Sequence, residues 1–67
     1  MNIIEEYKER VSYNFMANPK WRLGQTYFNT LYDMNPDLAN HIRGSNIDPF
    51  HNDSLIEDFE SYVKDHW

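Results

Sequence analysis

Histidines and carboxylates are the side chains of this 67-residue sequence whose chemistry could serve catalysis or metal binding. A metal site could be imagined from His41, His51 and Asp53, but their spacing matches no established ligand pattern. His66 stands apart, and no cysteine or serine in a strained turn accompanies the histidines as a nucleophile. Two glycines are too few for a phosphate-binding loop. The sequence therefore predicts a protein that is not an enzyme and binds neither a metal ion nor another cofactor.

Charge is distributed unevenly along the chain. Residues 1–32 carry four basic and three acidic groups, a net charge of +1, whereas residues 33–67 carry two basic and eight acidic groups, a net charge of −6. An acidic half repels phosphate backbones, so this pattern disfavours nucleic-acid binding. It favours a protein partner with a basic surface. We expect Glu57, Asp58 and Glu60 to form an acidic outer face on the last helix.

Length and composition predict a single domain over residues 1–67. A chain of this size buries only about 60% of its unfolded surface, so it has little stability to spare. The sequence has no cysteine for a disulfide, which fits a reducing compartment, and its eleven aromatic residues predict a core rich in rings. No apolar run approaches the roughly 20 residues of a membrane-spanning helix, so we expect no membrane association.

The elements that must position these groups are all predicted to be helical. Ile3, Tyr7, Val11 and Phe15 recur every fourth residue and predict a helix over residues 3–17 with one core face. Tyr13 and Met16 lie off this stripe, and we expect them to cap the edge of the core.

Two Asn-Pro pairs predict where the next helices begin. Asparagine is a favoured N-cap and proline suits the first helical position, so the second helix should begin at Pro19. The second pair, Asn35-Pro36, should end that helix near residue 34 and open a short third helix that stops at Gly44.

A loop over residues 45–52 should lead to the last helix, with Ile47 and Phe50 anchored in the core. Ser54 followed by Glu57 indicates a capping box, with Asn52 and Asp53 as alternative caps. The expected fold is all-α: a compact bundle of three longer helices and one short helix.

The second helix has two contrasting faces. An apolar arc covers about half its circumference and is expected in the core, which makes this helix central: Trp21, Leu23, Gly24, Tyr27, Phe28, Leu31, Tyr32 and Met34. The glycine within it suggests a close approach by the first or the last helix. The opposite face is polar: Arg22, Gln25, Thr26, Asn29, Thr30 and Asp33. These side chains either are solvated, or pin the following loop, or recognise a partner.

Arg43 and Asp48 are expected to form an ion pair across the loop. The candidate interaction residues are therefore Arg22, Gln25 and Asn29 on the second helix, Arg43, Asp48 and Phe50 around the loop, and Glu57, Asp58 and Glu60 on the last helix.

The sequence from Trp21 to Phe50 resembles a set of short, uncharacterised proteins of tailed bacteriophages. The resemblance rests on WRLGQTYFN, NPDL, IRG and DPF, and it spans 30 of the 67 residues. It implies a viral origin and expression in the bacterial cytoplasm, and it supplies no activity.

The leading hypothesis from the sequence is a small helical protein that binds and modulates a host or phage protein complex. One alternative is a nucleic-acid-binding helix-turn-helix formed around Asn35-Pro36, with Lys20, Arg22 and Arg43 as phosphate contacts. Another is a self-associating structural subunit that forms a homodimer through surplus aromatic surface.

Overall fold

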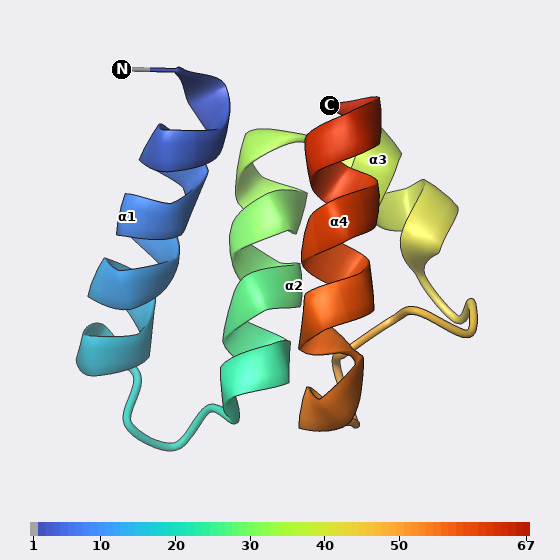
Figure 1. Cartoon of the computed structure of the whole chain (residues 1–67). Helices are drawn as coiled ribbons and strands as arrows, with labels where there is room; N and C mark the ends of the chain where they lie inside the picture. Colours follow the sequence, from blue (N-terminus) through green and yellow to red (C-terminus); the bar gives the residue numbers. More distant parts are fainter. Residues whose placement is uncertain (1) are drawn as a thin grey trace.

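Four α-helices and one short 3₁₀-helix make up the secondary structure of residues 2–67, the part of the chain that the computed structural model describes (Figure 1). In chain order they are α1 (Ile3–Ala17), α2 (Leu23–Met34), α3 (Pro36–Ile42), the 3₁₀-helix η1 (Asp53–Leu55) and α4 (Ile56–His66). The expected all-helical fold is confirmed. Within residues 2–67, no helix has the length and apolarity that a membrane span requires.

Helix α1 has the predicted bounds. The Asn2 side chain accepts a hydrogen bond from the backbone N–H of Glu5 at 2.9 Å and caps the first turn. Tyr7 and Val11 are buried at the centre of the predicted stripe. At the ends of the stripe Ile3 and Phe15 are about two-fifths exposed, at 41% and 42%, because the core covers only the middle of the helix.

The predicted start of the second helix at Pro19 is wrong. Asn18 ends α1 instead of opening α2, since its backbone N–H and its side-chain amide both donate to the carbonyl of Asn14, at 3.0 and 2.9 Å. The Trp21 N–H bonds the Asn18 carbonyl at 3.0 Å and closes a turn. Helix α2 therefore begins only at Leu23, four residues later than predicted.

The second Asn-Pro pair behaves as predicted. The Asn35 side chain accepts from the N–H of Leu38 at 3.2 Å, and Pro36 occupies the first turn of α3. Gly44 follows this helix with a φ of +75°, a left-handed conformation that favours glycine. Helices α2 and α3 are consequently separated by Asn35 alone.

The entry to α4 is capped by one of the alternative residues. Asn52, and not Ser54, is the cap: its side chain accepts from the Ser54 N–H at 3.0 Å and opens η1, which runs directly into α4. The capping box proposed for Ser54 and Glu57 is therefore wrong. Ile47 and Phe50 pack against the core, as expected for anchors of the preceding loop.

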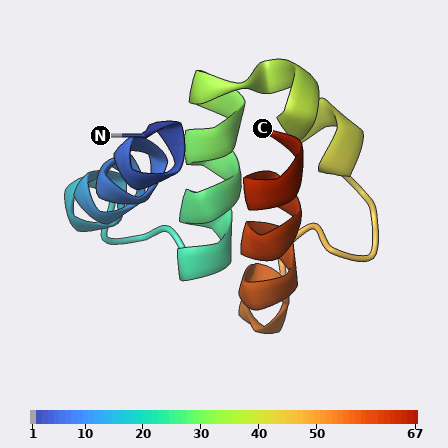
Figure 2. The same ribbon diagram turned by 45° about the horizontal axis from the view of Figure 1, so that its top comes forward.

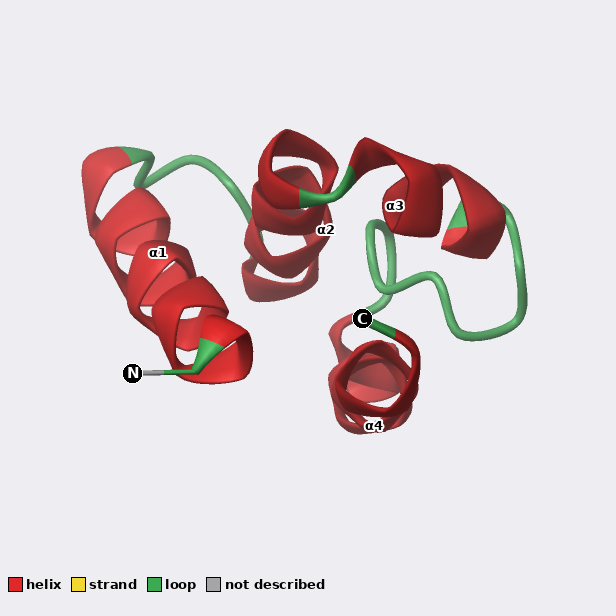
Figure 3. Cartoon of the chain, turned by 90° about the horizontal axis from the view of Figure 1, so that it is seen from above, coloured by secondary structure: helices red, strands yellow, loops and turns green. Residues whose placement is uncertain are grey.

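The core lies between the longer helices. Figures 1 and 2 show α2 between α1 and α4, and from above (Figure 3) α3 lies on the side of α2 opposite α1. Tyr7 of α1 joins the three longer helices, since its ring centroid lies 6.3 Å from that of Tyr27 and 5.5 Å from that of Trp67. Tyr27 also meets Phe59 of α4 edge-on, at 6.3 Å. The expectation of a ring-rich core is confirmed.

Gly24 does mark a close backbone approach, but the neighbour differs from the expected one. A Cβ atom at this position would lie 2.1 Å from the Pro49 carbonyl oxygen and 2.9 Å from Oδ1 of Asp53. The Gly24 N–H donates to the same Asp53 oxygen at 2.9 Å. The loop before α4 therefore packs against the first turn of α2, in the place predicted for another helix.

The buried and exposed residues of α2 also differ from the two faces that the sequence predicted. Thr26 and Thr30, expected on the polar face, are 0% and 1% exposed, while Leu23 and Tyr32, expected in the core, are 37% and 43% exposed. Each threonine hydroxyl donates to the carbonyl four residues earlier, at 2.9 and 2.7 Å. Their hydrogen bonds are thus satisfied within the helix, so these residues can be buried.

Candidate functional site

A hollow of about 320 Å³ lies between α2 and the segment that follows α3. We call it the α2–loop hollow. It brings together Asn29, Arg43, Asp48 and Phe50, four residues that the sequence singled out. Its other lining residues are Phe28, Tyr32 and His51. Residues more than 20 positions apart in the chain thus meet on one surface.

Arg43 lies across the aromatic wall of this hollow. Its guanidinium carbon is 5.4 Å from the ring centroid of Phe28 and 5.4 Å from that of Tyr32. Such contacts are cation–π interactions, which contribute roughly 0.5–1 kcal/mol at exposed sites. The expected ion pair with Asp48 does not form, because the guanidinium is stacked on rings and the carboxylate is engaged elsewhere.

Asp48 holds the loop instead. Its two carboxylate oxygens accept hydrogen bonds from the backbone N–H groups of Gly44, at 2.8 Å, and Phe50, at 3.0 Å. One side chain thereby connects the end of α3 to the aromatic residue that forms the far wall of the hollow. Phe50 meets Phe28 edge-on at 5.9 Å, so the wall continues from the loop onto α2.

Arg22 and Gln25 lie at the start of α2 and have structural contacts. The Arg22 guanidinium donates to the carbonyl of His51 at 3.4 Å, and the Gln25 side chain accepts from the Arg22 N–H, also at 3.4 Å. Both bonds are long. Arg22 fits the loop-pinning role that the sequence left open, and Gln25 helps to begin its own helix. Asn29 is half-buried in the α2–loop hollow.

The acidic candidates lie on α4, apart from the hollow. Glu57 and Asp58 are exposed in its first turn. Glu60 is half-buried and lines a hollow beside Tyr7, so its expected place on the outer face is wrong. The α4 helix turns this carboxylate toward α1, where Lys8 lines the same hollow.

Two tyrosines in this part of the core have shifted pKa values. Burial, followed by the neighbouring charges of Tyr27 and Glu60, raises the pKa of Tyr7 well above its ordinary value. Burial, followed by the nearby Glu60 carboxylate, raises the pKa of Tyr27 to about 12. The Tyr7 hydroxyl donates to the Tyr27 carbonyl at 2.7 Å, so it is engaged as a neutral donor. These tyrosines are structural groups at neutral pH.

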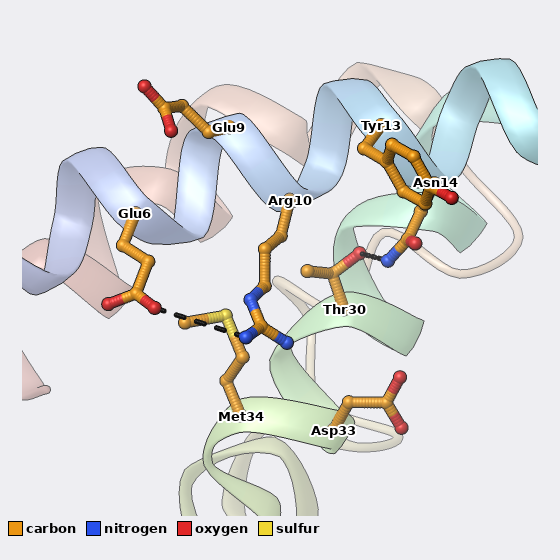
Figure 4. Close-up of a pocket in the computed structure, with 8 residues that line it drawn as sticks. All are labelled: Glu6, Glu9, Arg10, Tyr13, Asn14, Thr30, Asp33 and Met34. Atoms are coloured by element: carbon orange, nitrogen blue, oxygen red, sulfur yellow. Dashed lines mark hydrogen bonds and ion pairs between the residues drawn. The ribbon is translucent and has the colours of Figure 1, made fainter.

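A second hollow, of about 490 Å³, lies between α1 and α2, and the sequence did not reveal it (Figure 4). We call it the α1–α2 groove. In Figure 4, Glu6 and Arg10 extend from α1 toward α2, while Glu9 points away from α2. Asp33 lines the groove from α2. Three carboxylates and one guanidinium therefore give its lining residues a net charge of −2.

An interhelical hydrogen bond crosses one end of the groove. The Asn14 amide donates to the Thr30 hydroxyl at 2.9 Å (Figure 4). Tyr13 also lines the groove and is 73% exposed, and Met16 on the same helix is 82% exposed. Both were expected at the edge of the core, which is wrong. The signals of this surface in the sequence were their place off the apolar stripe and the polar residues Thr30 and Asp33 on the second helix.

The histidines do not converge. His41 and His66 stack on Tyr62, with ring centroids 6.3 and 3.9 Å away, and His51 lies in the α2–loop hollow. Within residues 2–67, no group of three or more histidine, cysteine, aspartate or glutamate side chains is placed to hold a metal ion.

Comparison of the chain with known protein families, with curated proteins and with solved structures finds no match.

Proposed function

We propose that this chain is a small non-catalytic binding protein, built as a helical bundle, that modulates a host or phage protein complex by contacting a positively charged partner. Its resemblance to short phage proteins extends the proposal to a bacteriophage origin and to the bacterial cytoplasm. The observation that supports the proposal is that most of the chain's negatively charged side chains have no positively charged partner.

Ten of the eleven carboxylates form no ion pair within residues 2–67. The one ion pair, between Arg10 and Glu6, is 3.9 Å long, and its side chains are 59% and 50% exposed. Exposed pairs of this kind contribute little to stability. Asp48 and Asp53 accept backbone hydrogen bonds, so they have structural roles. Glu60 is half-buried beside Tyr7 and Tyr27. The other carboxylates without an ion pair remain available to a partner.

The α1–α2 groove and the exposed start of α4 are the two surfaces that this charge favours. The groove combines a net charge of −2 with the accessible ring of Tyr13 and with Met34. Tyrosine is enriched in protein–protein interfaces because it adds a large apolar area and a hydrogen-bonding group. A negative field around such a surface accelerates encounter with a basic partner and makes association sensitive to salt.

The helix-turn-helix alternative is less well supported. DNA-binding pairs of this kind use a turn of 3–4 residues, whereas α2 and α3 are separated by Asn35 alone. Asp33 and Asp37 flank that junction, and Arg43 is stacked on rings. A gel-shift titration with duplex DNA and with RNA at low salt would support this alternative if it showed saturable binding.

Affinity capture at two salt concentrations, followed by reconstitution with the purified partner, tests the proposal. We expect a basic partner whose affinity falls at least tenfold between about 50 and 500 mM salt, since screening shortens the reach of exposed charges. Asp33→Asn should weaken binding if the partner occupies the groove. Asp58→Asn, which changes the net charge equally, should weaken it if the partner occupies the start of α4. Salt-independent binding would contradict the proposal. Sedimentation of the chain alone at two concentrations detects the homodimer alternative.

A further inference from the structure

The α2–loop hollow differs electrostatically from the rest of this acidic chain, because one guanidinium and one carboxylate leave its lining residues without net charge. Arg43 forms no ion pair with any carboxylate of residues 2–67, and the one carboxylate in the hollow, Asp48, is bound by two backbone N–H groups. The planar guanidinium lies over two rings, and its N–H donors are not used in an ion pair. A guanidinium in this state is suited to bidentate pairing with a carboxylate.

The walls beside Arg43 are aromatic and form continuous surface. Phe50 contacts Phe28 at 5.9 Å and the His51 ring at 4.8 Å, both with their planes steeply inclined. Tyr32 is 43% exposed at the rim. A volume of about 320 Å³ is at the lower end of the range for ligand pockets, roughly 300–1,000 Å³, so it suits a group the size of one large side chain.

The hollow is also held in place before any ligand arrives. Asp48 fixes the position of Phe50, Asp53 accepts from the Gly24 N–H at 2.9 Å, and the Pro49 carbonyl lies directly over Gly24. The loop is thus tied to the start of α2 on one side and to the end of α3 on the other. A site that needs little ordering loses less free energy on binding.

We infer that the α2–loop hollow binds an aromatic side chain of a partner protein that stands next to an acidic residue. The ring packs against Phe50 and the exposed ring of Tyr32, and the adjacent carboxylate pairs with the Arg43 guanidinium. This site does not depend on the acidic groove of the proposed function. Phe28 and Tyr32 lie on one side of α2, whereas Thr30 and Met34 line the α1–α2 groove on another.

Titration of the full ¹⁵N-labelled chain with two matched dipeptides tests the inference by NMR. The probes are acetyl-Trp-Asp-amide and acetyl-Trp-Asn-amide, which have the same shape and differ in one charge. We expect saturable shifts at the amides of Phe28, Tyr32 and Phe50, with the Asn probe binding about twofold to fivefold more weakly, since exposed charge pairs contribute modestly. Equal affinities for the two probes, or shifts confined to α1 and α4, would overturn the inference.

Variants of two arginines test which positive charge causes the difference in affinity between the two dipeptides. Arg43→Gln should abolish the difference between the dipeptides, and Arg43→Lys should retain part of it, because a lysine keeps the charge but loses the planar fork. Arg10→Gln is the matched control: it removes the same charge from the α1–α2 groove and should leave both affinities unchanged. A preference for the Asp probe that persists in a folded Arg43→Gln protein would count against the assignment.

Titration with a free small molecule distinguishes a site for a protein partner from a site for a metabolite. Indole-3-acetate carries the same ring and a carboxylate but has no peptide backbone. We expect it to bind the hollow more weakly than acetyl-Trp-Asp-amide. Binding of indole-3-acetate that is as tight as the dipeptide would assign the hollow to a small molecule and would refute the choice of a protein ligand.

Discussion

Gly24 joins the loop before α4 to the start of α2, so a methyl group added there should destabilise the protein measurably. In Gly24→Ala the new Cβ atom would lie 2.1 Å from the Pro49 carbonyl oxygen and 3.0 Å from its carbonyl carbon, both backbone atoms. The loop must move, because backbone atoms cannot rotate out of the way as a flexible side chain can. That movement also strains the hydrogen bond from the Gly24 N–H to Asp53.

The size of the effect follows from three contributions. Overpacking costs about 1–3 kcal/mol, and weakening one hydrogen bond costs about 1 kcal/mol. Replacing glycine by alanine inside a helix returns about 1 kcal/mol. The free energy of unfolding should therefore fall by about 2 kcal/mol, which for a domain of this size lowers the melting temperature by roughly 8–16 °C. Gly24→Leu should destabilise the protein more, since the added side chain is larger.

Circular dichroism during heating and urea unfolding measure the loss of stability, and amide hydrogen exchange locates it. The Asn52 N–H donates to the Pro49 carbonyl at 3.1 Å, so displacement of that carbonyl should accelerate its exchange. Gly44→Ala is the control, because nothing lies within 4 Å of its Cβ position and its cost comes from its φ of +75° alone. A Gly24→Ala protein as stable as the native chain, or one in which Asn52 keeps its protection, would refute the reasoning.

Three further perturbations test other contacts. Burial raises the pKa of Tyr7 and Tyr27, so above pH 10 the native state retains phenol protons that the unfolded state loses. The free energy of unfolding should therefore keep this contribution below pH 10 and decrease as the pH rises toward 12. Urea unfolding should show a smaller decrease over this range in Tyr7→Phe than in the native chain. Thr30→Val should cost about 1–3 kcal/mol in urea unfolding by leaving the Asn14 amide unpaired, whereas an unchanged midpoint would mean that water replaces the hydroxyl. Asp48→Ala should loosen the α2–loop hollow, seen as faster exchange at the Gly44 and Phe50 amides, and unchanged exchange would contradict its role.

Local capping signals predicted one junction correctly and the other incorrectly. Asn35 and Asn18 both precede proline, yet Asn35 caps the helix that follows and Asn18 bonds backward to Asn14. The difference lies downstream: Trp21 closes a turn on the Asn18 carbonyl before a new helix can begin. An Asn-Pro pair permits a helix start, but the packing of the next few residues decides whether one forms.

The residues of the α2–loop hollow were identified from the sequence, but the interactions among them were not. Arg43 and Asp48 suggested an ion pair because their charges are opposite and their separation is short. The backbone N–H groups of Gly44 and Phe50 compete for the same carboxylate, and the rings of Phe28 and Tyr32 compete for the guanidinium. Neither competitor is evident from spacing, since both depend on how the loop folds against α2.

The burial of Thr26 and Thr30 narrows the surface on which α2 can meet a partner. Counting hydroxyls as polar placed both residues on the polar face, although a threonine bonded to the carbonyl four residues earlier has no unsatisfied polar group. Helix α1 packs on this side through Asn14, so it divides the predicted polar face in two. Asn29 is left facing an aromatic hollow that contains the Arg43 guanidinium, and Asp33 an acidic groove. One face inferred from the sequence is therefore two surfaces of different charge, since the lining residues of the hollow carry no net charge and those of the groove carry −2. A partner that binds one has no electrostatic reason to bind the other.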